Sequence, residues 1–344
     1  MHRRRPDLRA VTVGFDDPRF DERPHALARR PARPRPRRGG PAPRARSATS
    51  SAWPSSATCR CTTPRPGRRC WSARRPARHV TVALTGDGGD EGFRRPPPLP
   101  LRPGRAAPSA GCPAAGSGLA ALYPKADFLP RPLRLKRTLQ DLGVEPAEAY
   151  YRSVSALLPD EVARLLAPRA GERRHPFTGL REAWARTRGP DHTSRVLELD
   201  LHTYLPGDIL VKVDRCSMQS SLELRSPLLD PRILSFAAGL PTDWKVDGRR
   251  GKKVLKAAFE PWLGRELLER PKRGFSVPLA AWLRGPLRAA RDEAIAGDFA
   301  AAFLDPAELR RQAAEHDAGR RDRAEALWAA LMLDRWNRRW GRVA

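Results

Sequence analysis

Two Arg/Pro-rich windows interrupt the chain and limit how much of it can join one packed core. From Arg23 to Gly86, and again from Gly92 to Pro124, every charged side chain is an arginine. Neither window shows the apolar spacing of a helix or the alternation of a half-buried strand. Such a composition buries too little apolar surface to offset the entropy lost on ordering. The windows also hold most of the net charge of +27, so that charge does not describe one folded surface.

Two explanations of the windows, bounded here as residues 26–77 and 94–118, stay open. They are either natural linkers or stretches of GC-rich coding DNA read in a shifted frame, which yields Arg, Pro, Ala, Ser, Gly and stray Cys. A long structureless passage between two core strands is uncommon, because connections in compact domains usually have about 2–6 residues. We favour the shifted frame, since ordinary sequence returns abruptly after each window.

Outside the windows the chain carries ordinary strand and helix signals. Short β-branched runs at residues 11–15 and 80–84 predict two buried strands. Capping residues and apolar positions spaced near 3.6 predict helices at residues 145–150, 159–166, 194–201 and 324–336. In the last helix the expected core contacts are Trp328, Leu331 and Trp336. The predicted order is two strands separated by a window, followed by a largely helical remainder.

Composition disfavours several classes of protein. No run approaches the roughly 18 apolar residues of a membrane-spanning helix, and no apolar segment follows the basic N-terminus, so a cytoplasmic protein without membrane association is expected. Cys59 and Cys61 lack a second ligand pair at zinc-site spacing, and Cys216 is interpreted as a reduced core residue. Nucleic-acid binding by the windows is disfavoured, because Trp53 and Trp71 alone make no stacking platform.

The turn Thr85–Glu91, directly after the second predicted strand, combines glycines with acids. Its members are Gly86, Asp87, Gly88, Gly89, Asp90 and Glu91. Glycines let backbone N–H groups approach an anion closely, and carboxylates suit Mg²⁺, which keeps phosphate oxygens in its shell. A plain acidic turn and a Ca²⁺ loop are the alternatives, although the twelve-residue EF-hand spacing is absent. Ligands of open α/β sheets bind at the carboxyl ends of strands, where this turn lies.

Charged residues recur inside the apolar segment 200–230. They are Asp208, Lys212, Asp214, Arg215, Glu223, Arg225 and Asp230. Charges among core positions are costly unless they are paired or used, so this segment predicts either a functional site or an ion-pair network. In the structural alternative, buried pairs hold the domain together through Arg215, Glu223, Arg225 and Asp230.

A loop at residues 269–278 is fixed by two prolines and a glycine and presents Lys272 and Arg273. A lysine held on a rigid loop can neutralise the charge that develops on a phosphate leaving group. Surface Lys-Arg pairs are common, so the loop alone is weak evidence for a site. His79 and His202 are interpreted as ordinary structural residues rather than catalytic bases.

Together these segments resemble the C-terminal synthetase domain of the asparagine synthetase family. Residues 80–91 are similar to its strand followed by S-G-(E/D)-G-x-D-E, and residues 204–230 to its helical motif Y-L-x-D-D-I-L-x-K-x-D-R-x-S-M and the following S-L-E-x-R-x-P-x-L-D. Residues 270–278 match R-P-K-x-G-F-x-V-P, and residues 327–336 match its closing helix. The strand at 11–15 is similar to the one after the family's first nucleotide motif. The particular residues in these motifs resemble most those of bacterial amidotransferases linked to exopolysaccharide and exosortase systems.

The resemblance implies an α/β fold, with a parallel sheet flanked by helices (adenine nucleotide α-hydrolase-like, Rossmann-like) and a mainly helical C-terminal part. It implies an ATP-dependent ligase that uses ATP and Mg²⁺ to adenylate a small-molecule carboxylate, aspartate or a related acid. Ammonia, free or derived from glutamine, then attacks to give an amide. A homodimer is compatible with this resemblance.

Residue by residue, the resemblance implies a role for each matched position. Asp87 and Lys272 are the expected catalytic residues. The nucleotide is expected at Val13, Thr85, Gly86 and Gly88, the substrate at Asp208 and Glu91, and the metal at Asp90.

Departures from the family pattern predict impaired catalysis. The S-G-G-x-D-S pyrophosphate loop would precede the strand at 11–15, and a glutaminase domain would precede that loop, yet the sequence contains neither. Arg94 and Arg95 replace glycines of the family. The expected organisation is a synthetase fragment at 1–25, the irregular or frameshifted segment 26–77, the nucleotide-site strand and loop at 78–93, the second irregular segment 94–118, and the helical remainder 119–344. A non-catalytic scaffold and, less favoured, a basic nucleic-acid-binding protein are the alternatives.

Overall fold

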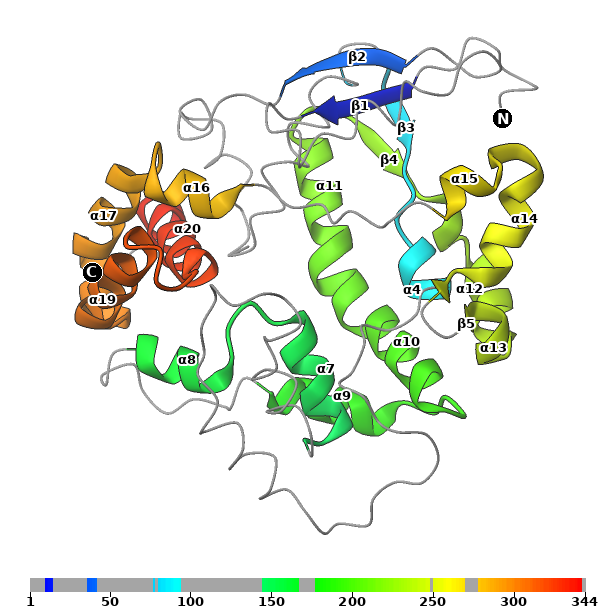
Figure 1. The fold of residues 1–344 in the computed structure, drawn as a ribbon, viewed down its shortest axis with the longest axis horizontal. Coiled ribbons are helices and arrows are strands. Elements are labelled where there is room, and N and C mark those ends of the chain that lie inside the picture. Colours follow the sequence, from blue (N-terminus) through cyan, green and yellow to red (C-terminus); the bar gives the residue numbers. More distant parts are fainter. Residues whose placement is uncertain are drawn as a thin grey trace.

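The computed structural model describes residues 10–14, 36–41, 77, 80–93, 144–166, 177–247, 250–269 and 278–341. For residues 10–14 and 36–41 it describes the backbone only. Most of the described chain is helical, with a few short strands, most of them towards one end of the molecule (Figure 1).

Four short strands form two parallel pairs. They are β1 (Ala10–Gly14), β2 (Pro36–Pro41), β3 (Val82–Leu84) and β4 (Glu223–Arg225). β1 pairs with β2, and β3 pairs with β4 in a register that places Val82 opposite Glu223 and Leu84 opposite Arg225. β1 and β3 confirm that strands form at the β-branched runs, but the prediction that the second strand is buried is wrong. Val82 and Leu84 are 39% and 48% exposed, because a pair of three-residue strands leaves a face uncovered.

The sequence pattern indicated no strand between residues 26 and 77, whereas the structure has β2 there. Parallel pairing uses backbone N–H and C=O groups, so it does not require the apolar alternation that a sequence pattern detects. Instead of one continuous sheet, the described strands form three two-stranded sheets, the third being antiparallel.

The middle of the chain is a run of helices, of which the first, third and fourth share an apolar core, while Leu165 of the second is buried with the C-terminal helices. It comprises α7 (Pro146–Val154), α8 (Pro159–Leu165), α9 (Thr178–Arg186), α10 (His192–His202), the π-helix η3 (Leu205–Leu210) and α11 (Val211–Met218). Tyr150, Trp184 and Leu199 are buried together in this core. The Tyr150 hydroxyl donates to Asp200, and burial together with this carboxylate raises the pKa of Tyr150 above its ordinary value. The predicted helices at 145–150, 159–166 and 194–201 are confirmed.

Short helices and one hairpin follow β4. They are the 3₁₀ turn η4 (Pro227–Leu229), α12 (Pro231–Gly239), α13 (Thr242–Lys245), β5 (Val246–Asp247), β6 (Arg250–Gly251), α14 (Lys253–Leu263) and α15 (Arg265–Leu268). The small helix α4 (Gly89–Phe93), which follows β3, packs against α12 and α14. Figure 1 shows this group on the opposite side of α10 and α11 from the C-terminal helices.

The C-terminal helices form a second apolar core. They are α16 (Leu279–Arg284), α17 (Arg288–Ala296), α18 (Asp298–Phe303), α19 (Pro306–Asp317) and α20 (Ala324–Trp340). Trp328 and Leu331 of α20 are buried in this core, as predicted, while Trp336 is only half-buried. Because α20 packs against α16, α17, α18 and α19, its apolar face is the main contact surface of the group.

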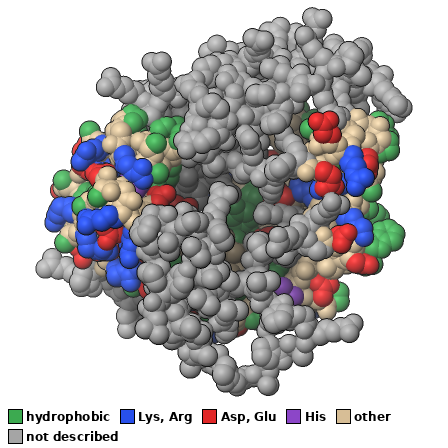
Figure 2. Space-filling view, in the orientation of Figure 1, with side chains coloured by type: hydrophobic (Ala, Val, Ile, Leu, Met, Phe, Trp, Pro, Cys, Tyr) green, Lys and Arg blue, Asp and Glu red, His purple; other side chains and the backbone are tan. Residues whose placement is uncertain are grey.

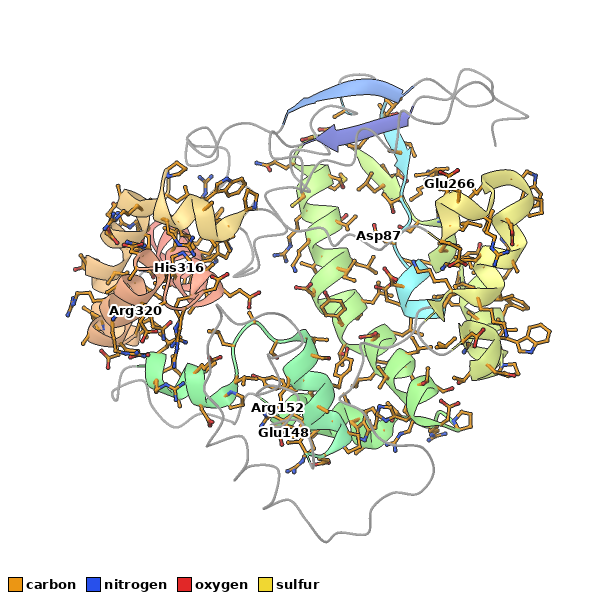
Figure 3. The ribbon with its side chains drawn as sticks, in the orientation of Figure 1. Asp87, Glu148, Arg152, Glu266, His316 and Arg320 are labelled. Carbon is orange, nitrogen blue, oxygen red and sulfur yellow. The ribbon has the colours of Figure 1, made fainter. Side chains whose placement is uncertain are left out.

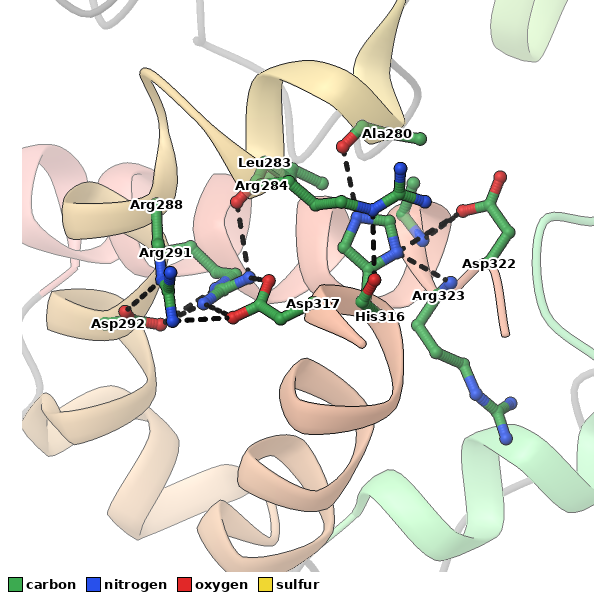
Figure 4. A network of polar contacts seen from close by, with 11 residues as sticks. Ala280, Leu283, Arg284, Arg288, Arg291, Asp292, His316, Asp317, Asp322 and Arg323 are labelled. Carbon is green, nitrogen blue, oxygen red and sulfur yellow. Dashed lines mark hydrogen bonds and ion pairs between the residues drawn. The ribbon is translucent and has the colours of Figure 1, made fainter. Parts of the chain in front are cut away.

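A buried polar network joins α16, α17 and α19 (Figure 4). The Arg291 guanidinium donates to both Asp317 carboxylate oxygens at 2.7 and 3.0 Å and to the Leu283 carbonyl at 3.2 Å. His316 is fully buried, its Nε2 is 3.2 Å from the Ala280 carbonyl, and its Nδ1 accepts from a backbone N–H at 3.2 Å. Every group in this network lies away from β3 and α4, so its role is structural.

Cys216 of α11 is buried and forms no disulfide within the described residues, which agrees with its interpretation as a reduced core residue. Within the described part of the chain no helix is both long and apolar enough to cross a bilayer. On the face seen in Figure 2, basic and acidic side chains of the described residues are interspersed on both flanks. Many charged side chains of the described residues are paired, as Arg311 is with Glu308 and Glu315.

Candidate functional site

The turn after β3 is fastened to the chain segment after β4. The Thr85 N–H donates to the Arg225 carbonyl at 2.9 Å, which continues the parallel pairing one residue beyond β3. The Thr85 hydroxyl lies 2.7 Å from the Ser226 hydroxyl. Two bonds therefore fix the point at which the strand leaves the pair and the turn begins.

Gly88 lets the turn pack directly on η4. Its φ is +89°, a conformation that a residue with a Cβ rarely adopts. A Cβ at this position would lie 2.3 Å from the Leu229 Cδ2 atom. Gly86, in contrast, would carry a Cβ into open space. The turn thus has one face packed on η4 and one open position at its start.

The three acids of the turn differ in exposure. Asp87 is half-buried where β3 passes towards α4, and Figure 3 labels it there. Asp90 is also half-buried and pairs with Lys252, whose Nζ is 3.1 Å from its Oδ1. Glu91 is buried on α4. Asp87 and Asp90 are therefore the turn carboxylates that a ligand can reach.

Asp208, the predicted substrate-binding residue, lies on the π-helix between α10 and α11. π-Helical turns are rare and often mark functional sites, because the extra residue redirects the following side chains. Asp208 forms an ion pair with Lys212, whose side chain is only 2% exposed. The Asp208 carboxylate balances the charge of the buried Lys212 ammonium at the junction of η3 and α11.

The alternative of buried pairs is wrong for Glu223, Arg225 and Asp230. Glu223 and Arg225 pair with each other on the exposed face of β4, their side chains being 54% and 65% exposed. Asp230 accepts from the side chain and the backbone N–H of Arg232, which lowers the pKa of Asp230 to about 2. It begins α12 as an N-cap rather than holding a buried pair. The pattern misled because residues on a three-residue strand alternate between faces, so charges flanking a leucine point outward.

Arg215 differs from these residues, because one of its guanidinium nitrogens is buried. Within the described residues this nitrogen, Nη1, makes no hydrogen bond. The prediction of a buried pair at Arg215 is therefore not met at this atom.

Two predicted site residues cannot be placed beside the turn. Lys272 lies outside the described residues, together with the rest of its loop from Arg270 to Val277. Val13 lies on β1 and only its backbone is described. The site geometry therefore rests on the turn Thr85–Glu91, η4 and Lys252.

The donor set fits a magnesium ion that is held mainly by phosphate. In the described ranges no three His, Cys, Asp or Glu side chains gather into a cluster that would hold a metal alone. Mg²⁺ in nucleotide sites needs only one or two protein carboxylates, because phosphate oxygens and waters complete its shell. Asp87 and Asp90 meet that smaller requirement.

Comparison of the sequence with known proteins assigns the chain to a family. The sequence profile of the family described as "Asparagine synthase" matches residues 68–338. The chain belongs to the asparagine synthase family. The family membership agrees with a mostly helical domain that contains a small parallel sheet, as in adenine nucleotide α-hydrolase-like domains.

Two relatives show how far the similarity extends. A Mycobacterium tuberculosis protein with the provisional name asparagine synthetase (glutamine-hydrolyzing) is 33% identical over 285 residues, which cover 77% of this chain and 40% of the relative. Asparagine synthetase (glutamine-hydrolyzing) 1 of Bacillus subtilis is 27% identical over 270 residues, which cover 77% of this chain and 41% of the relative. The chain thus spans about two fifths of the length of these asparagine synthase family proteins.

Sequence reasoning missed Ser226 and Lys252, which contact the turn from distant parts of the chain. Ser226 lies inside the motif at residues 204–230, but at a variable position that carries no signal of its own. Lys252 stands in a run of basic residues, Arg249 to Lys253, that reads as an ordinary solvated surface. Only the fold shows that one member of this run reaches Asp90.

Proposed function

We propose that the chain is the synthetase domain of an ATP-dependent amide ligase of the asparagine synthetase type. It would activate a small carboxylic acid, aspartate or a related acid, with ATP and then transfer the acyl group to ammonia. The observation that carries this proposal is the turn Thr85–Glu91, which leaves a parallel strand pair with one open glycine and two accessible carboxylates. The family match and the names of both relatives support the same chemistry.

The residues of the turn divide the work of binding. Thr85, Gly86 and Gly88 would lie against the nucleotide, because a backbone without side chains lets phosphate oxygens come within reach of N–H groups. Asp87 would lie next to the acyl adenylate, and Asp90 would hold the metal. When bound, Mg²⁺ supplies positive charge that screens the phosphate oxygens from the incoming carboxylate.

The remaining predicted roles depend on residues away from the turn. Lys272 would neutralise charge on the departing pyrophosphate. Val13 would contact the adenine, Asp208 would help to orient the acceptor acid, and Glu91 would support the substrate pocket from within α4. We also propose that the domain has one Rossmann-like parallel sheet flanked by helices.

Exchange of labelled pyrophosphate into ATP tests the proposal, because only reversible adenylation of the acceptor causes it. Since the departures from the family pattern predict impaired catalysis, we expect weak exchange. It should require aspartate or a related acid together with Mg²⁺, and Asp87→Asn should reduce it at least tenfold. The exposed residue Asp298, in the first turn of α18, provides the control: Asp298→Asn removes the same charge and should leave exchange unchanged.

Other outcomes would contradict the ligase assignment. ATP binding without exchange for any acid tested would identify a nucleotide-binding scaffold. DNA binding that weakens steeply with salt, in the absence of ATP binding, would favour the basic nucleic-acid-binding interpretation.

A further inference from the structure

Lys252 joins the end of α4 to the start of α14. Its backbone N–H donates to the Phe93 carbonyl, the last residue of α4, at 2.9 Å. Its φ is +61°, the left-handed conformation, and it immediately precedes α14. A non-glycine residue in this region is uncommon and persists where the surroundings determine it. The backbone of Lys252 is therefore fixed relative to the turn.

The side chain of Lys252 reaches the turn itself. Its ammonium lies 3.1 Å from Asp90 Oδ1 and 3.6 Å from the position that a Cβ on Gly89 would occupy. Both partners of the ion pair are about one third exposed, at 33% for Lys252 and 35% for Asp90. A lysine that is fastened by its backbone and free to rotate near its tip can move its charge over a few ångströms without a change in the fold.

The next residue, Lys253, is directed elsewhere. Its Nζ donates to the Asp243 carbonyl at 3.2 Å, on the side of α13, and its side chain is exposed. Lys252 and Lys253 have the same chemistry and the same local charge, but only Lys252 contacts the turn. Comparing variants of the two lysines therefore distinguishes the loss of the contact with the turn from the loss of one positive charge.

We propose that Lys252 is a positioning residue of the nucleotide site, which holds Asp90 in the absence of ligand and transfers its ammonium to a phosphate oxygen when nucleotide binds. The inference rests on the proposed function and adds a residue to it. Asp90 cannot give its full charge to a cation while the ammonium shares the same oxygen. When the phosphates bind, the Lys252 ammonium can pair with an oxygen that carries more negative charge. Once the ammonium has left Asp90, that carboxylate can bind the cation.

The exchange of partners predicts two opposite effects of removing the ammonium. Lys252→Met keeps the length and apolar stem of the side chain. It should weaken binding of ATP at saturating Mg²⁺ about tenfold, because a phosphate contact is lost. It should also lower the Mg²⁺ concentration needed for half-maximal ATP binding severalfold, because Asp90 is no longer shared. Damage to the fold would weaken both responses, so opposite directions mark a positioning role.

Isothermal titration of the full chain with ATP, at a series of Mg²⁺ concentrations, measures both effects. Lys253→Met is the matched control and should bind ATP within twofold of the wild-type chain. Lys252→Arg keeps the charge and should recover most of the lost affinity. Urea unfolding of each variant confirms that the chain remains folded.

The outcomes separate the two proposals. If the wild-type chain binds ATP and Lys252→Met binds equally tightly with an unchanged Mg²⁺ requirement, the role of Lys252 is wrong and the proposed function stands. If Lys252→Met and Lys253→Met weaken ATP binding equally, the loss of net positive charge explains the effect and the positioning role of Lys252 is wrong. If the wild-type chain binds no ATP at any Mg²⁺ concentration, the proposed function fails and the role of Lys252 fails with it.

Discussion

Substitution of Gly88 by alanine should unfold the turn that forms the candidate site. The added Cβ would lie 2.3 Å from Leu229 Cδ2 and 2.6 Å from Leu229 Cγ, far inside van der Waals contact, and the φ of +89° would be strained for alanine. A left-handed conformation costs a residue with a Cβ about 1–2 kcal/mol, and overpacking typically adds about 1–3 kcal/mol. Together these terms predict a loss of about 2–5 kcal/mol in the free energy of unfolding.

Urea unfolding provides the assay for this prediction. With a slope of about 2 kcal/mol per molar urea, the midpoint of Gly88→Ala should fall by about 1–2.5 M. Gly86→Ala is the matched control, because nothing lies within 4 Å of its added Cβ, and its midpoint should stay within about 0.3 M of the wild type. A second test combines Gly88→Ala with Leu229→Ala, which removes the clashing atoms. The double variant should lose clearly less than the sum of the two single changes.

Two results would refute this reasoning. Equal midpoints for Gly88→Ala and Gly86→Ala would mean that neither the conformation nor the contact with Leu229 matters. Strict additivity in the double variant would mean that the clash is relieved elsewhere, leaving only the backbone term.

Three further predictions concern the rest of the fold. Burial lowers the pKa of His316, so the unfolded chain binds the proton more readily than the folded chain. The contribution of His316 to stability should therefore be full above about pH 6.5 and fall as the pH drops below that value. Urea midpoints measured at pH 7.5 and 5.5 should differ less for His316→Gln than for the wild type. Asp317→Asn removes the bidentate partner of the buried Arg291, which keeps Asp292 at 2.7 Å, and should cost about 1.5–3 kcal/mol. Arg181→Ala, in an exposed pair with Glu145, should cost at most about 1 kcal/mol, and equal losses would contradict the distinction. Asp191→Ala removes the acceptor for the Ser194 N–H and the Thr242 hydroxyl at the start of α10, and calorimetry should show a loss of about 1–2 kcal/mol, while no change in melting temperature would exclude a capping role.

The sequence predicted those helices whose signals are local. α20 was recognised from apolar spacing alone, and its buried residues Trp328 and Leu331 are the ones that the spacing indicates. Trp336 is less buried because it lies towards the end of the helix, where fewer neighbouring helices remain to cover it. Periodicity locates a face, but only packing decides how far along the helix that face is covered.

The candidate site was predicted in part for the same reason. Glycines and acids in one turn are adjacent in sequence, so Thr85–Glu91 could be recognised without a structure. Contacts from Ser226, Leu229 and Lys252 are set by the pairing of β3 with β4 and by the path of the chain into α14, which no local pattern encodes. The left-handed conformation of Lys252 was equally hidden, because glycine or asparagine usually marks such a position.

The assignment of buried charges shows a further limit of sequence patterns. For the charged residues Glu223 and Arg225, which flank a leucine, buried pairs were one of the two interpretations, yet both residues lie on the open face of a short strand. The expectation of an ion pair among the charges of this segment holds for Lys212, which is buried and paired with Asp208. On a helix of several turns neighbouring faces are covered by packing, whereas a strand pair of three residues has one face left open to solvent.

Hydrogen–deuterium exchange with and without Mg-ATP most directly tests the claim that the turn after β3 is a nucleotide site. Saturating Mg-ATP should slow exchange of the backbone N–H groups between residues 85 and 93, because they would face phosphate oxygens in place of water. The helix α19, which belongs to the C-terminal core, should exchange at the same rate in both states. Unchanged exchange at residues 85–93 when the nucleotide is bound, or protection confined to another segment, would contradict the account.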